Sequence, residues 1–195
     1  DFSIYMDTDG LIHAGSGLDQ VTWMDVRVGD WVATPRHGKP VEINALWYNA
    51  LCTMDMLQAK FGDNDDSYRQ LASLVKTSFN KRFWNENTGC LYDVVDEDDD
   101  TIRPNQIYAV SLPFTMPDME REKAIVDTVM DKLYVGCGLR SLDPDHKDYH
   151  PIYIGSLSKR DHAYHQGTAW GFLLGGFISA YVKAVSYTHL RAPRD

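Results

Sequence analysis

The chain has 195 residues, 44% hydrophobic and 12% aromatic, which is the composition of a globular domain with a core and not of a disordered chain. Its formal net charge is −9 at pH 7 and its Lys and Arg residues do not cluster, so we expect neither a nucleic acid nor a membrane as partner. Three widely spaced cysteines predict no disulfide framework and favour a reducing compartment, the cytoplasm.

Residues 1–40 are rich in Gly and Asp and show little periodicity, which predicts loops with short strands. The first residues lack the basic start and apolar run of a secretory signal. One short stretch of this segment contains two Trp and two Asp residues, which are Trp23, Asp25, Asp30 and Trp31. Aromatic rings stack on the apolar face of a sugar while carboxylates bond its hydroxyls, so a sugar site is one interpretation. The other is a Trp-rich edge of the core with ordinary surface charges.

Two helices follow in the sequence. The first opens at Pro40, which suits a first helical position, and its apolar side chains recur at helical spacing as far as Met54. After an acidic loop, a second helix is expected over 67–83 with Ser67 as its N-cap. Its expected buried stripe consists of Tyr68, Leu71, Leu74, Val75 and Phe79.

The middle of the chain predicts a turn and an extended arm over 83–95, followed by an acidic run at 96–100 that is typical of a solvated loop. Pro104 starts a short third helix, which Pro113 stops. A fourth helix is expected over 118–134.

Asp118 is the expected N-cap of that fourth helix. The last helix is expected over 163–182, where Gly171 and Gly175 would let a neighbouring helix approach closely. This segment carries no Asp, Glu, Lys or Arg and is long enough to cross a membrane as a helix. Its His, Gln and Gly residues favour a buried inner helix instead.

Two kinds of helix therefore alternate. Helices 67–83 and 118–134 have one apolar stripe, whereas the more apolar ones begin in the polar clusters "PVEIN", "RPNQ" and "AYHQG". Outer helices wrapped round inner helices, with the polar starts gathered at one mouth, would give this pattern. The sequence thus predicts an all-α fold, specifically an α/α toroid.

Hydrolysis of a glycosidic bond needs two carboxylates that flank the bond. Asp25 stands among apolar neighbours in "WMDV", where desolvation would raise its pKa and suit a general acid; the alternative is that it caps a turn. Glu42 enters an apolar helix face and needs a partner, which Arg36 could supply bidentately. The alternative for Glu42 is an acid favoured by the helix dipole.

The cluster "RDHAYHQGTAW" adds polar groups that can bind sugar hydroxyls, although His165 could equally be a satisfied core histidine. The spacings of His146, His150, His162 and His165 are compatible with zinc, but no H-E-x-x-H motif occurs and no metal or cofactor is expected. Motifs for acyl, phosphoryl or hydride transfer are missing from the sequence. A module that binds glycan without chemistry stays an alternative.

Several motifs, in this order, resemble the glucosidase domain of glycogen debranching enzymes, most closely the prokaryotic amylo-α-1,6-glucosidase type. They are "TWMD", "ATPRHGKPVEINALWYNAL", "RPNQIYAVSLPF", "GLRSLDPDHKDYHPIYIG" and "AYHQGTAW". The resemblance covers about residues 10–184. It implies a six-hairpin α/α barrel that hydrolyses α-1,6-linked glucose at branch points of glycogen, a branched α-glucan, with inversion. Hydrolysis of another glycoside by a related barrel is a further alternative.

The resemblance also implies roles for particular residues. The Asp of "TWMD" is the general acid of the family and corresponds to Asp25, with Glu42 as a second catalytic candidate. The expected sugar-binding residues are Trp23, Arg36, Asn44, Asp161, His165, Gln166 and Trp170. Eukaryotic relatives carry the general base, a Glu, where this chain has Ala169, so the base is expected at Glu42 or Asp161, or is missing.

The chain is also short for such a barrel, which has twelve helices, because only about five long periodic segments occur. Residues 1–184 are therefore expected to be the C-terminal part of a barrel whose first half lies upstream. The final segment, 185–195, breaks the helical pattern and is expected to be a non-native or disordered tail.

Overall fold

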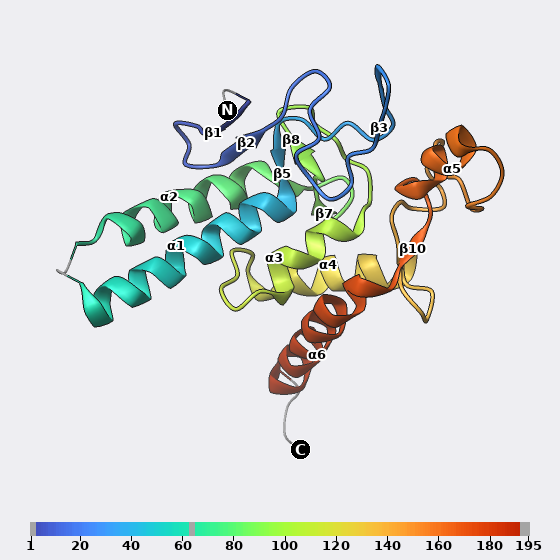
Figure 1. The fold of residues 1–195 in the computed structure, drawn as a ribbon. Helices are drawn as coiled ribbons and strands as arrows, with labels where there is room; N and C mark the ends of the chain where they lie inside the picture. The colour runs from blue at the N-terminus through green and yellow to red at the C-terminus, as the bar shows by residue number, and fades with distance from the viewer. Residues whose placement is uncertain (1–2, 63–64, 192–195) are drawn as a thin grey trace.

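Helices make up most of the regular secondary structure, as the sequence predicts (Figure 1). The computed structural model describes residues 3–62 and 65–191, and their side chains as far as Ala184. Within these ranges lie six α-helices and two 3₁₀ turns. They are α1 (Val41–Phe61), α2 (Ser67–Arg82), η1 (Pro104–Ile107), α3 (Tyr108–Ser111), α4 (Met119–Lys132), α5 (Leu157–Tyr164), η2 (Gly171–Leu173) and α6 (Leu174–Arg191).

The strands of the described residues are two or three residues long and form antiparallel pairs. The pairs are β1 (Ile4–Met6) with β2 (Ile12–Ala14), β3 (Arg27–Val28) with β4 (Trp31–Val32), β5 (Lys39–Pro40) with β8 (Val94–Val95), β6 (Trp84–Asn85) with β7 (Cys90–Leu91), and β9 (Leu139–Arg140) with β10 (Ala169–Trp170). The β5–β8 and β9–β10 pairs join segments that lie far apart in sequence. They fix the chain just before α1 and just before η2.

Helices α1 and α2 run side by side as a hairpin (Figure 1). Helix α1 starts one residue later than expected, because Pro40 is its N-cap and Val41 is its first helical residue. Ser67 was expected to cap α2 but is its first helical residue, and its hydroxyl donates to Asp65 Oδ2 over 2.7 Å. Within the expected stripe of α2, Val75 and Phe79 are buried, whereas Leu74 is 42% exposed.

The third expected helix is tighter and shorter than its apolar pattern predicts. Pro104 starts it, but η1 has 3₁₀ geometry and only the single turn of α3 follows. The prediction for α4 is confirmed in detail. Its N-cap is Asp118, whose carboxylate accepts the backbone N–H groups of Glu120 and Arg121 at 3.1 and 2.9 Å.

The expected start of the last helix at residue 163 is wrong. Residues 157–164 form α5, Ala169 and Trp170 form β10, and α6 begins only at Leu174. Between α5 and β10, Gly167 has a non-helical φ of +155°, and only glycine fits there because a Cβ would lie 2.3 Å from the carbonyl oxygen of His150. β10 then pairs with β9, an interaction across about thirty residues that local periodicity cannot reveal.

Helix α6 also differs from expectation at its other end, since it continues through Arg191, past the point where the apolar spacing stops. Residues 192–195 lie outside the described residues, and the non-native origin of 185–195 stays a prediction. A Cβ on Gly175 would meet nothing within 4 Å, so the close approach expected there is wrong. At Gly171, the other expected position, a Cβ would lie 3.3 Å from the carbonyl oxygen of Cys137, and at Gly176 it would lie 3.4 Å from the Ser111 hydroxyl.

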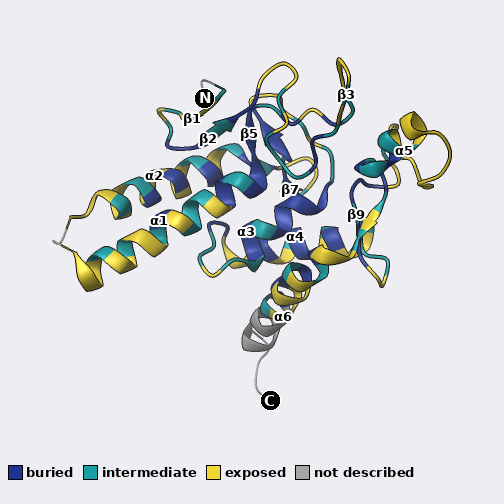
Figure 2. Cartoon of the chain, in the orientation of Figure 1, coloured by how far each residue is buried: buried dark blue, intermediate teal, exposed yellow. Residues whose placement is uncertain are grey.

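One apolar core joins α1, α2, α4 and α6, with α3 between them. Exposed residues remain along α1 and α6 (Figure 2), and large apolar residues are among them. On α1 they are Leu46, Met54, Met56, Leu57 and Phe61, and on α6 they include Ile178 and Tyr181. Among the described residues, no helix has both the length and the hydropathy needed to cross a membrane.

We expect the isolated chain to self-associate, because Leu57, Phe61 and Ile178 are 45%, 75% and 57% exposed. Sedimentation velocity and unfolding temperature over a range of protein concentrations would measure this. Replacing these three side chains by Gln should shift the chain toward monomer. A control replacement of the exposed polar residue Gln70 should leave the association state unchanged. A sharp, concentration-independent melt of a wild-type monomer would contradict the expectation.

Candidate functional site

A buried ion cluster centred on Arg36 lies where α1 begins. The guanidinium is 1% exposed and binds Glu42 bidentately, with 2.7 Å between Nη2 and Oε2 and a second contact between Nη1 and Oε1. Its Nε donates to Asp93 Oδ2 over 2.6 Å. Burial opposes the charge of Arg36, but Asp93 and Glu42 outweigh that effect and raise its pKa. The predicted pairing of Arg36 with Glu42 is therefore confirmed, whereas Asp93 was not anticipated.

Glu42 is fully engaged by this cluster. It is 2% exposed and both of its carboxylate oxygens face Arg36. A general base must be free to accept a proton from water in the active site. The catalytic role expected for Glu42 stays a prediction, and the geometry assigns this carboxylate to holding Arg36.

Asn105 extends the cluster to the tryptophan beside the expected general acid. Its Nδ2 donates to Asp93 Oδ1 over 2.8 Å, and its Oδ1 accepts the indole N–H of Trp23 over 2.8 Å. Sequence reasoning missed Asn105 as a site residue, although it belongs to the polar start "RPNQ" of the third expected helix. Its amide is fully buried, a property that only the folded structure reveals.

Asp25 is 8% exposed and its two oxygens have different surroundings. Oδ2 accepts the backbone N–H groups of Val21 and Thr22, each over 2.7 Å, so the carboxylate does cap the turn before it. Oδ1 is buried and has no hydrogen-bond partner among the described residues. Asp25 is thus anchored through one oxygen only, which leaves the other available for a proton.

An aromatic cluster brings the first and last motifs of the sequence together. The Trp23 ring meets His165 edge-on at a centroid distance of 5.1 Å and Trp170 at 6.1 Å. His165 in turn stacks on Trp170 at 5.5 Å. Burial, together with the charges of Arg103 and Arg36, lowers the pKa of His165 to about 4. The three predicted residues therefore share one environment, in which the imidazole is neutral.

Arg103 ties this aromatic segment to the rest of the site. It is buried, and its Nη2 donates to Gln166 Oε1 while its Nη1 donates to the backbone carbonyl of His165, both over 2.8 Å. A further bond from Nη1 reaches the carbonyl of Ser141 at 3.1 Å. Burial lowers the pKa of Arg103, an effect that Asp93 opposes. The sequence analysis did not single out Arg103.

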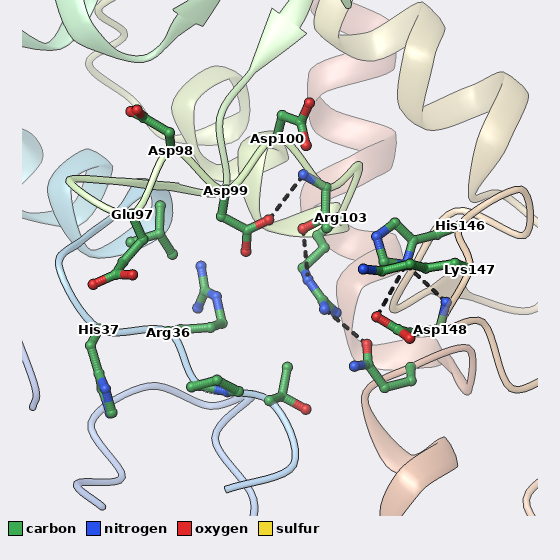
Figure 3. Close-up of a pocket in the computed structure, with 15 residues that line it drawn as sticks. Arg36, His37, Glu97, Asp98, Asp99, Asp100, Arg103, His146, Lys147 and Asp148 are labelled. Atoms are coloured by element: carbon green, nitrogen blue, oxygen red, sulfur yellow. Dashed lines mark hydrogen bonds and ion pairs between the residues drawn. The ribbon is translucent and has the colours of Figure 1, made fainter. Parts of the chain in front are cut away.

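A hollow of about 480 Å³ opens beside these groups. Figure 3 shows Arg36 and Arg103 at its centre, between the acidic loop 97–100 and the loop 146–148. The lining contains charged side chains of both signs together with Gln166 and His37, and apolar atoms contribute about as much of its surface as polar ones. Asp25 and the aromatic cluster lie outside this lining. The hollow therefore meets the predicted residues at Arg36 and Gln166.

Two further predicted residues lie apart from this network. Asn44 donates to the carbonyls of Ile12 and Pro40 and accepts the N–H of Ile12 over 2.7 Å, so its amide holds β2 against α1. Asp161 is half-buried on α5. Sugar binding by either residue stays a prediction. Within residues 3–62 and 65–191, no three His, Cys, Asp or Glu side chains are grouped as metal ligands would be.

Removing one partner of the Arg36 cluster should strongly destabilise the protein, because an unpaired charge would remain buried. We expect Glu42→Gln to lower the free energy of unfolding by about 3 kcal/mol, as measured by urea unfolding. The matched control is Asp127→Asn on α4, which breaks an exposed pair with Lys123 and should cost less than about 1 kcal/mol. Equal losses in the two variants would contradict the assignment.

His165 should make stability depend on pH in the acidic range. Its folded pKa of about 4 lies below the ordinary 6.5, so the unfolded chain binds the extra proton and stability falls as pH drops from 6.5 towards 4. The loss attributable to His165 amounts to at most about 3 kcal/mol. His165→Phe should remove this part of the slope in unfolding measurements from pH 7 to 4. Parallel curves for the two proteins would refute it.

Comparison with known proteins agrees with this arrangement of motifs. Residues 1–192 match the family described as amylo-alpha-1,6-glucosidase. The glycogen debranching enzyme of Saccharomyces cerevisiae (strain ATCC 204508 / S288c) is 29% identical over 227 aligned residues, which cover 91% of this chain and 15% of the yeast protein. The chain thus spans a small part of the length of that relative. On the family match, which covers nearly its whole length, the chain belongs to the amylo-alpha-1,6-glucosidase family.

Proposed function

We propose that the protein containing this chain is a glycoside hydrolase that removes α-1,6-linked glucose at branch points of glycogen or a similar glucan. The observation that carries the proposal is the meeting of Trp23 with His165 and Trp170, an aromatic cluster that begins two residues before Asp25, whose carboxylate is hydrogen-bonded through Oδ2 only. Family membership and the name of the yeast relative support the same substrate class.

Asp25 is proposed as the general acid. Two backbone N–H groups hold Oδ2, so the carboxyl group keeps its orientation while Oδ1 carries the proton to the glycosidic oxygen. Inversion then requires a second carboxylate that activates a water on the opposite face of the sugar ring. Because Arg36 occupies Glu42, we propose Asp161 as the base; the alternative is that this chain supplies no base.

The hollow beside Arg36 supports a neutral, hydroxyl-rich ligand. Its volume of about 480 Å³ lies within the range of small-molecule sites. Its lining offers acceptors from Asp99 and Asp148 and donors from Arg103 and Lys147, beside apolar surface that includes Pro35 and Val94. Such a mixture satisfies sugar hydroxyls, which both donate and accept. We propose that glucosyl units of the branched substrate occupy this hollow.

We also propose that residues 1–184 are the C-terminal part of an α/α toroid, whose remaining helices come from elsewhere in the protein. The antiparallel pair α1 and α2 is the unit from which such a fold is built. Exposed apolar side chains on α1 and α6, including Phe61 and Ile178, offer the surface that further helices would cover.

The test of the activity uses the full protein that contains this chain, wild type beside Asp25→Asn, on a branched limit dextrin. Glucose release is followed by NMR so that the anomer formed first is seen. We expect β-glucose from the wild type and at least about a hundredfold slower release from the variant. Asp30→Asn is the matched control, because Asp30 is exposed in the β3–β4 turn, and it should release glucose at the wild-type rate.

Each other outcome would overturn a defined part of the proposal. Release of α-glucose first would refute inversion. A fully active Asp25→Asn variant would remove Asp25 as the acid. Dextrin binding by the wild type without any release would mean that this protein binds glycan and performs no hydrolysis.

A further inference from the structure

We propose that Asn105 is a positioning residue that sets the orientation of the Trp23 indole, and that Asp93 fixes which way the Asn105 amide points. The inference rests on the proposed function, in which Trp23 is part of the sugar-binding surface beside Asp25. It adds two residues, Asn105 and Asp93, that affect substrate binding indirectly, through the orientation of Trp23.

The direction of each hydrogen bond follows from the chemistry of its partners. The indole of Trp23 can only donate and the carboxylate of Asp93 can only accept. Asn105 lies between them, with Oδ1 towards the indole and Nδ2 towards the carboxylate, each at 2.8 Å. If the amide were flipped, Nδ2 would face the indole N–H of Trp23, a donor against a donor. Oδ1 would face the carboxylate of Asp93, an acceptor against an acceptor. The charge of Asp93 therefore selects a single amide orientation, and with it a single indole position.

The rest of the cluster keeps Asp93 itself in place. Its Oδ2 receives Nε of Arg36 over 2.6 Å, and both oxygens of Glu42 hold the same guanidinium. Because Arg36, Glu42 and Asp93 are all nearly fully buried, solvent does not compete for these bonds. The order Glu42, Arg36, Asp93, Asn105, Trp23 thus forms one continuous set of polar contacts that ends at the aromatic cluster.

Asn105 also contacts the residue between Trp23 and the expected acid. Its Nδ2 lies 3.2 Å from Sδ of Met24, which is fully buried. A single side chain therefore touches two consecutive residues of the segment whose next member is Asp25. Loss of the Asn105 amide would free the indole and loosen this segment.

The test is a double-mutant cycle in the full protein, with Asn105→Leu and Trp23→Phe singly and together, and limit dextrin as substrate. We expect Asn105→Leu to raise KM about tenfold in the wild type, as loss of a buried hydrogen bond would. In the Trp23→Phe background, where no indole N–H exists, the same change should raise KM less than about twofold. A purely structural Asn105 would give equal effects in both backgrounds, and that result would overturn the proposal.

The matched control is Asn49, whose amide also bridges two segments, through Phe114, away from the site. Asn49→Leu should lower the unfolding temperature and leave KM unchanged.

If Asn105→Leu does not fold, the indole N–H resonances of the wild type provide the test. The Trp23 indole proton, assigned through Trp23→Phe, should exchange with solvent at least about tenfold more slowly than that of Trp31, which is 37% exposed. Equal exchange rates would overturn the proposal. If the wild type binds dextrin but releases no glucose, the proposed function fails. The double-mutant cycle then uses the dissociation constant for dextrin in place of KM, so the proposal on Asn105 is still tested.

Discussion

The buried charge of Arg36 is the constraint on which the rest of the site depends. A guanidinium out of water costs several kcal/mol unless anions face it, and here Glu42 and Asp93 both do. Arg103 brings a second positive charge, with its Nε 3.8 Å from Asp93. The cluster therefore contains two guanidinium groups and two carboxylates. Glu42 lies in the first turn of α1 and Asp93 directly precedes β8. The need to neutralise Arg36 therefore fixes the start of α1 against the strand pair β5–β8.

The elements that could be predicted from the sequence are those whose signals are local. The apolar spacing of α1 and the carboxylate of Asp118 at the start of α4 depend on residues within a few turns of one another. The start of α6 could not be predicted, because β10 is drawn out of the helical pattern by β9, about thirty residues earlier. A favourable long-range ladder and the conformation of Gly167 outweigh the helical periodicity there.

The same distinction separates the site residues that were anticipated from those that were not. Arg36 and Glu42 are six residues apart, so their pairing could be inferred from the segment itself. Asp93 lies 57 residues from Arg36, and Asn105 lies 82 residues from Trp23. No local pattern marks such partners. They can be identified only in the folded structure, where each buried donor is paired with an acceptor from a distant part of the chain.

These separations also bear on the order in which the molecule assembles. The α1–α2 hairpin joins neighbouring segments and closes a short loop, so its contacts cost little chain entropy and can form early. The contacts of Arg36 and Trp23 close loops of 57 and 82 residues, and the bond from Arg103 to His165 closes one of 62. The site should therefore be among the last parts to form during folding. Its aromatic cluster would serve as a spectroscopic marker of the fully native state, distinct from the helical signal that precedes it.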